Sequence, residues 1–169
     1  KVSQPLTGWL GHIKPFDFEV EYQPANDINK FICGTPPIIA YKAIESGLEI
    51  FKDLSIIEIR EKSIKLSEMF IQLMQQECTE FGFTLFSPKN SEQRGSQISF
   101  LHENAYPIIQ ALISHGIIGD YREPNIMRFG ISPLYMRFED VWNAITCLRE
   151  IMQTGEWQSE KFKNKNYVT

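Results

Sequence analysis

The chain has 169 residues, of which 43% are hydrophobic, and its formal net charge is −4. This composition is ordinary for a globular protein with a packed core, and the scattered basic residues form no face for nucleic acid. No apolar run approaches the roughly 20 residues that span a bilayer. The length allows one domain, or a small domain with part of another.

The three cysteines, Cys33, Cys78 and Cys147, are odd in number and widely spaced. They form no Cys-x-x-Cys pair and no cluster with histidine, so we expect no metal site. Reduced thiols are typical of the cytoplasm. We therefore expect a cytoplasmic protein.

Residues 1–35 are rich in glycine, proline and aromatic side chains, with no sustained helical or strand period. Such a segment requires other protein to bury its rings. We expect an interface here for five aromatic residues: Trp9, Phe16, Phe18, Tyr22 and Phe31.

Apolar residues at helical spacing predict a helix over about residues 36–51 and a longer helix that ends near Phe81. Asp53 or Ser55 is expected to cap the second helix, and Gly82 is suited to its C-terminal end. The later chain predicts strands over 83–86, 97–101, 117–121 and 126–130, a helix over 106–115 and a last helix through 141–152. This pattern indicates a small α+β domain over 54–155, with a mostly antiparallel sheet covered by helices on one face. The tail after Gly155 is expected to fray.

Thr35 precedes Pro36-Pro37 at the start of the first predicted helix. A hydroxyl residue at the N-cap and proline at the first helical position suit a helix start, whose free N–H groups favour a phosphate. Spacing alone leaves open a Thr-Pro start that only caps its own helix.

Arg128 lies in a predicted strand between Met127 and Phe129, so it points to the opposite face from these apolar neighbours. A planar guanidinium can hold a carboxylate through two parallel hydrogen bonds. The residues alone favour the alternative, a surface arginine paired with Glu123 or Asp140.

Trp9 is flanked by glycines, which let its indole approach a ligand or a second subunit, although a core or interface role is also open. The three histidines are far apart and have no Ser or Cys partner at an interpretable spacing, so no catalytic triad is indicated. His12 suits a structural hydrogen bond. Tyr121 is expected to be structural, as are its neighbours, although a substrate contact stays open for it.

Four segments resemble the kynureninase family, and the resemblance runs over most of residues 6–153. They are Leu-Thr-Gly-Trp-Leu-Gly-His at 6–12, Phe-Ile-Cys-Gly-Thr-Pro-Pro-Ile at 31–38, Gly-Ser-Gln-Ile-Ser-Phe-Leu-His at 95–102, and the segment 116–135 around Arg128. The resemblance implies the α/β fold of type I pyridoxal-phosphate enzymes. Residues 1–53 would be the end of the large cofactor-binding domain, 54–155 the linking helix with the small C-terminal domain, and 156–169 a tail.

The implied reaction is the hydrolysis of L-kynurenine, or 3-hydroxykynurenine, to anthranilate (or 3-hydroxyanthranilate) and L-alanine, in tryptophan catabolism and NAD biosynthesis. By resemblance, Trp9 and Thr35 bind the phosphate of pyridoxal 5'-phosphate and Arg128 binds the substrate's α-carboxylate. The implied protein is a homodimer with shared sites. None of the nearby lysines (Lys14, Lys30 and Lys42) fits the family's cofactor-lysine motif. That lysine is expected before residue 1, and the chain alone is expected to be inactive.

Two other readings stay open. One is a different enzyme of the same fold type, such as an aminotransferase or a cysteine desulfurase-like protein. The other is a non-enzymatic interaction module formed by residues 54–155.

Overall fold

The computed structural model describes residues 3–164. The chain divides into two compact units between Leu54 and Ser55. We call their described parts the N-terminal unit (3–54) and the C-terminal unit (55–164), and each is described by itself. None of the helices within residues 3–164 has the length and apolar character needed to cross a membrane.

The N-terminal unit contains two short 3₁₀ helices, η1 (Trp9–Gly11) and η2 (Ile28–Phe31), followed by helix α1 (Ile38–Glu49). Backbone hydrogen bonds from Ala25 N to Gly11 O (2.9 Å) and from Ile13 N to Gln23 O (2.7 Å) close the loop between η1 and η2. Gly11 and His12 are the only buried residues between positions 3 and 54. The apolar stripe predicted for α1 is therefore exposed within this unit.

Helix α1 begins two residues later than the sequence predicts. Pro37 is its N-cap residue, and no side chain caps it, so the prediction that Thr35 caps this helix is wrong. A proline disfavours helical geometry in the residue before it. Pro36 and Pro37 therefore disfavour helical geometry at Thr35 and Pro36, and the helix starts only at Ile38.

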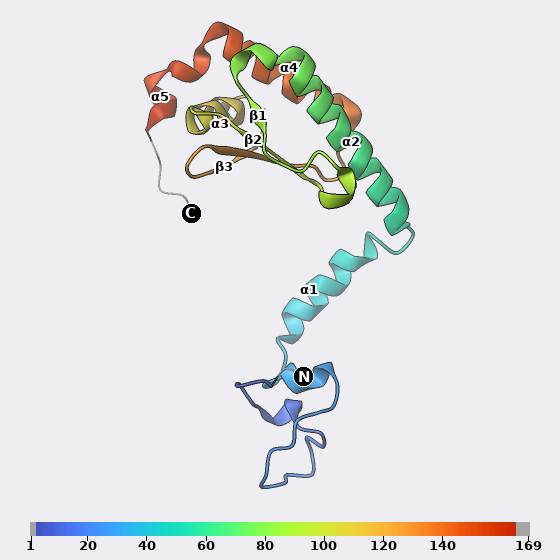
Figure 1. The fold of residues 1–169 in the computed structure, drawn as a ribbon. Coiled ribbons are helices and arrows are strands. Elements are labelled where there is room, and N and C mark those ends of the chain that lie inside the picture. Colours follow the sequence, from blue (N-terminus) through green and yellow to red (C-terminus); the bar gives the residue numbers. More distant parts are fainter. Residues whose placement is uncertain (1–2, 165–169) are drawn as a thin grey trace. The chain divides into compact units, whose positions relative to one another are not determined.

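The C-terminal unit is an α+β domain, as predicted (Figure 1). Its sheet has the strand order β1-β2-β4-β3, and every neighbouring pair is antiparallel. The strands are β1 (Thr84–Leu85), β2 (Gln97–Leu101), β3 (Asp120–Arg122) and β4 (Ile126–Gly130). The helices are α2 (Ile56–Glu77), α3 (Ala105–Ser114), α4 (Phe138–Thr154) and α5 (Glu160–Lys163), with 3₁₀ turns η3 (Thr79–Phe81), η4 (Ser91–Gln93) and η5 (Glu156–Gln158).

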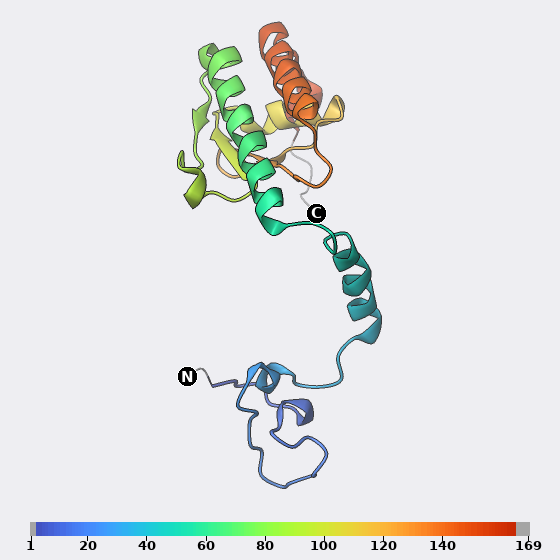
Figure 2. The ribbon, with the colours of Figure 1, turned by 90° about the vertical axis from the view of Figure 1, so that its right-hand side faces the viewer.

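The helices α2, α3 and α4 contribute to one buried core on a single face of the sheet (Figures 1 and 2). Alternate strand residues enter this core, and the register places Phe100 opposite Met127 in β2 and β4. The ring of Phe70 in α2 lies 5.0 Å from that of Phe129 and 6.1 Å from that of Phe100. Helix-to-sheet packing of this kind leaves the second face of the sheet free for other contacts.

The ends of α2 follow local chemistry. Ser55 is its N-cap and accepts a hydrogen bond from Ile57 N (3.3 Å). The helix ends at Glu77 rather than near Phe81, because the chain tightens into the 3₁₀ turn η3 before reversing at Gly82, whose φ is +82°. That left-handed backbone angle favours glycine.

The segment after Gly155 is ordered where the sequence predicts fraying. Phe162 is buried in the core, and Trp157 packs against its edge. The hydroxyl of Tyr106 donates to the backbone carbonyl of Asn164 (3.0 Å). Burial of Phe162 and partial burial of Trp157 account for the difference. The rest of the predicted tail, residues 165–169, lies outside the described residues.

Candidate functional site

Arg128 lies in the middle of β4 and points away from the helices. Its neighbours Met127 and Phe129 are buried in the core, whereas its own side chain is 29% exposed. The predicted strand alternation is therefore confirmed. We call this second face of the sheet, which carries Arg128, the outer face.

Asp120 in β3 is the partner of Arg128. The two residues stand directly opposite each other across the antiparallel pair β3–β4. Arg128 Nε donates to Asp120 Oδ1 (2.9 Å) and Arg128 Nη2 donates to Asp120 Oδ2 (2.8 Å). A second arginine, Arg122, lies on the same face with its Nη2 3.3 Å from Asp120 Oδ2. The outer face thus carries a cluster of two guanidinium groups around one carboxylate.

The partners expected for a structural Arg128 were wrong. Glu123 instead accepts a hydrogen bond from Tyr121 Oη (2.8 Å), and Asp140 pairs with Arg137 (2.7 Å) at the start of α4. The hairpin register explains the choice, because it places residue 120 opposite residue 128. The sequence signal that could have predicted the pair of Asp120 and Arg128 is the tight turn at Pro124 between the two strands.

The electrostatics of the pair keep both groups charged. The hydrogen bond from Arg128, with the charges of Arg128 and Arg122, lowers the pKa of Asp120 below its ordinary value of 3.8. The same hydrogen bond raises the pKa of Arg128. A permanently charged, partly exposed guanidinium is suited to binding a carboxylate.

In the N-terminal unit, the backbone brings the segments of Trp9 and Thr35 together. A Cβ atom built on Gly8 would stand 1.5 Å from the carbonyl oxygen of Cys33, so only glycine permits this approach. Cys33 Sγ also donates to the carbonyl of Leu6 (3.1 Å). Gly8, the residue before Trp9, therefore contacts the backbone of Cys33, which lies two residues before Thr35.

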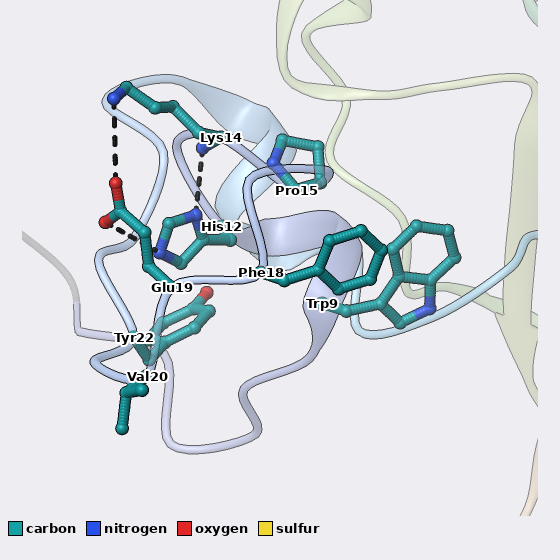
Figure 3. A pocket seen from close by; sticks show the side chains of 8 residues that line it. All are labelled: Trp9, His12, Lys14, Pro15, Phe18, Glu19, Val20 and Tyr22. Atoms are coloured by element: carbon teal, nitrogen blue, oxygen red, sulfur yellow. Dashed lines mark hydrogen bonds and ion pairs between the residues drawn. The ribbon is translucent and has the colours of Figure 1, made fainter.

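Trp9 lines a pocket of about 330 Å³ formed with the loop that follows it (Figure 3). Its indole is 48% exposed and makes an edge-on contact with Phe16 at 5.6 Å. Figure 3 shows the ring of Phe18 beside it. Phe18 is 86% exposed and has a φ of +53°, a strained value for a residue other than glycine. The eight lining residues are Trp9, His12, Lys14, Pro15, Phe18, Glu19, Val20 and Tyr22.

The histidines and Tyr121 have structural contacts. His12 Nδ1 accepts from Lys14 N (2.9 Å), and its Nε2 lies 3.3 Å from the carbonyl oxygen of Glu21. Tyr121 is paired with Met127 in the register, on the core side of the sheet. It therefore does not share a face with Arg128.

The N-terminal segments fit a phosphate group. Thr35 is exposed, and a Cβ on Gly34 would meet no atom within 4 Å. Within residues 3–164, the backbone N–H groups of Gly34 and Thr35 donate to no backbone carbonyl. The indole of Trp9, which is half exposed, carries a further N–H donor. Free donors beside a glycine are the chemistry that a phosphate requires.

The predicted site residues thus form two groups, one in each unit. Trp9 and Thr35 belong to the N-terminal unit, and Arg128 belongs to the C-terminal unit. Sequence reasoning missed Asp120 as a contact of Arg128 and Gly8 as the residue that allows the Trp9 and Thr35 segments to meet. No cluster of three or more metal-ligating side chains occurs among residues 3–164.

The family model described as "Kynureninase C-terminal domain" matches residues 59–148, more than half of the chain. A protein named "Kynureninase" from Pseudomonas fluorescens is 44% identical over 168 residues. Proteins of the same name from Burkholderia mallei (strain SAVP1) and Burkholderia pseudomallei (strain 1106a) are 44% identical over 167 residues. Each of these matches covers 99% of this chain and 40% of the relative. The chain therefore belongs to the kynureninase family, and residues 59–148 of its C-terminal unit match the C-terminal domain of that family.

Proposed function

We propose that the full-length protein is a pyridoxal-phosphate-dependent kynureninase of the cytoplasm. It hydrolyses L-kynurenine, or its 3-hydroxy form, to anthranilate (or 3-hydroxyanthranilate) and L-alanine, in tryptophan catabolism and NAD biosynthesis. The observation that supports this most is the match of residues 59–148 to the kynureninase C-terminal domain, together with 44% identity to kynureninases along the chain. The match disfavours both an enzyme of another family and a non-enzymatic module.

Arg128 binds the α-carboxylate of the substrate in this proposal. It is the partly exposed cation at the centre of the outer face, held by a neighbouring strand rather than by a flexible loop. A guanidinium fixed on a sheet orients a carboxylate as well as attracting it. The substrate's reacting bond is then held in one position.

Trp9 and Thr35 bind the phosphate of the cofactor. The exposed indole N–H and the exposed hydroxyl belong to segments that meet at Gly8 and Cys33. When bound, pyridoxal phosphate supplies the electron sink that makes a carbon–carbon bond labile. Residues 1–53 are, in this proposal, the end of the domain that binds it.

The exposed rings of the N-terminal unit support a larger assembly. Phe16 and Phe18 are 69% and 86% exposed, and α1 has no buried residue. Apolar surface on this scale marks contact with other protein. We assign it to the rest of the cofactor-binding domain and to a second subunit, in a homodimer that places Trp9 near the partner's cofactor.

The test is turnover by the purified full-length protein. With added pyridoxal phosphate and L-kynurenine, we expect equimolar anthranilate and L-alanine, measured by anthranilate fluorescence and amino-acid analysis. The 169-residue chain alone is expected to form neither product. A full-length protein with bound cofactor that leaves both kynurenines intact would contradict the proposal.

A further inference from the structure

The guanidinium of Arg128 has two edges that can each hold a carboxylate, one formed by Nε with Nη2 and the other by Nη1 with Nη2. Asp120 occupies the first edge with both of its oxygens, at 2.9 and 2.8 Å. Within the part of the chain that the structure describes, the hydrogen bonds of the Arg128 guanidinium use Nε and Nη2 and leave Nη1 without a protein acceptor. The second edge therefore retains a pair of donors for a ligand.

The charge of the cluster suits a ligand with one negative charge. Arg122 shares Asp120 with Arg128, at 3.3 Å from Oδ2. Two guanidinium groups and one carboxylate leave one net positive charge on this part of the outer face. A single carboxylate would neutralise it, whereas without Asp120 the two arginines would repel each other.

The backbone holds this arrangement in place. Asp120 and Arg128 are opposite residues of a paired hairpin, so their separation is set by the β3–β4 ladder. Ser99 stands opposite Arg128 on its other side, in β2, and is 5% exposed. Because the neighbour in β2 is small, the two hydrogen bonds to Asp120 on the other flank are what orient the guanidinium plane.

We propose that Asp120 is the positioning residue for the substrate-binding arginine. It holds the Nε and Nη2 edge of Arg128 and so directs the remaining edge toward the α-carboxylate of an amino-acid substrate. Asp120 itself does not contact the substrate. This inference rests on the proposed function and adds a residue to that site.

The experiment compares L-kynurenine with its α-carboxamide, which has no carboxylate, as substrates of the full-length enzyme with bound cofactor. Wild type is expected to prefer the acid. In Asp120→Asn, we expect kcat/KM for the acid to fall about 10- to 100-fold, mainly through KM, because the guanidinium loses its orientation. The value for the amide should change little, so the acid-to-amide ratio falls. Asp120→Ser replaces this variant if Asp120→Asn does not fold.

Two further variants separate positioning from structural damage. Glu77→Gln removes the partner of Arg149, an ion pair between α2 and α4 of similar exposure. It should lower stability without changing the acid-to-amide ratio. In an Arg128→Lys background, Asp120→Asn should have little further effect on that ratio, since Asp120 acts through Arg128.

If Asp120→Asn has the same acid-to-amide ratio as wild type, the inference is overturned, even where both activities fall equally. The inference is also overturned if Asp120→Asn lowers the ratio as much in the Arg128→Lys background as in wild type. A wild-type enzyme that hydrolyses neither compound overturns the proposed function itself, and the inference with it.

Discussion

The carbonyl oxygen of Cys33 occupies the space that a side chain at position 8 would need. A Cβ on Gly8 would lie 1.5 Å from this oxygen and 2.6 Å from Cys33 Cα, with only backbone atoms in the way. Backbone cannot yield as the end of a flexible side chain can. This close approach brings the Trp9 segment against the Thr35 segment, together with the hydrogen bond from Cys33 Sγ to Leu6 O.

Gly8→Ala should therefore separate the two segments, whereas Gly34→Ala adds a methyl group where no atom lies within 4 Å. In the full-length protein, we expect Gly8→Ala to lower the melting temperature and to weaken pyridoxal-phosphate binding. Gly34→Ala should leave the melting temperature of the cofactor-free protein close to wild type. Thermal unfolding without cofactor distinguishes them, and equal melting temperatures for both variants would contradict the assigned role of Gly8.

Trp9→Phe keeps an aromatic ring but removes the indole N–H. If this group binds the cofactor phosphate, the loss of one hydrogen bond to a charged group should raise the Kd of pyridoxal phosphate about 10- to 100-fold. Trp142→Phe is a matched control, since Trp142 in α4 is 50% exposed and Trp9 is 48% exposed. Cofactor titration followed by absorbance gives both constants. Similar Kd values for Trp9→Phe and wild type would remove Trp9 from the site.

Thr35 does not cap α1, because the N-cap residue of that helix is Pro37. A phosphate contact would depend on its hydroxyl alone. Thr35→Val should weaken cofactor binding about tenfold without a change in melting temperature, and Thr35→Ser should restore most of it. The same titration measures the effect. Equal weakening by valine and serine would point to packing instead of a hydroxyl contact.

Arg128→Lys keeps the positive charge and loses the planar, paired contact. In the full-length enzyme, we expect kcat/KM for L-kynurenine to fall on the order of 100-fold, with cofactor absorbance intact. The melting temperature should change little, because the pair with Asp120 is partly exposed and lysine can still contact it. Arg137→Lys, which alters another arginine paired with an aspartate, is the control. Near-normal turnover by Arg128→Lys would exclude a substrate contact.

His102 should make the stability of the C-terminal unit depend on pH. Its Nε2 lies 2.9 Å from Phe81 O, while Nδ1 accepts from Asn104 N (3.0 Å), so both nitrogens are used by the neutral ring. Burial lowers the pKa of His102 below its ordinary value of 6.5. A depressed pKa means that the folded state binds the proton less readily than the unfolded state does. The stability that the neutral His102 ring contributes to the folded state is therefore complete above pH 6.5. It is lost as the pH falls through the folded-state pKa of His102.

Chemical unfolding of the 169-residue chain at several pH values tests this. His102→Gln should lose about 1–3 kcal/mol at pH 7.5, and its difference from wild type should shrink at acidic pH. His115→Gln replaces an exposed histidine and should change stability by no more than about 0.5 kcal/mol. A difference between His102→Gln and wild type that stays constant with pH would show that the ring does not titrate.

The sequence by itself determined the strands 97–101 and 126–130, the helices around them and the family. These features depend on local periodicity, on caps such as Ser55 and on motifs that lie close together in the chain. It also assigned Arg128 to the face opposite Met127, because strand alternation needs no knowledge of the partner strand.

Only the tertiary structure decided which residue faces Arg128, since a shift of the hairpin register would exchange Asp120 for another side chain. It also decided that the segment after Gly155 is ordered, because Phe162 is buried by residues far away in the sequence. Likewise, the need for glycine at position 8 comes from Cys33, a residue 25 positions further along the chain. Each of these outcomes depends on a contact between segments distant in sequence, and local patterns carry no information about such contacts.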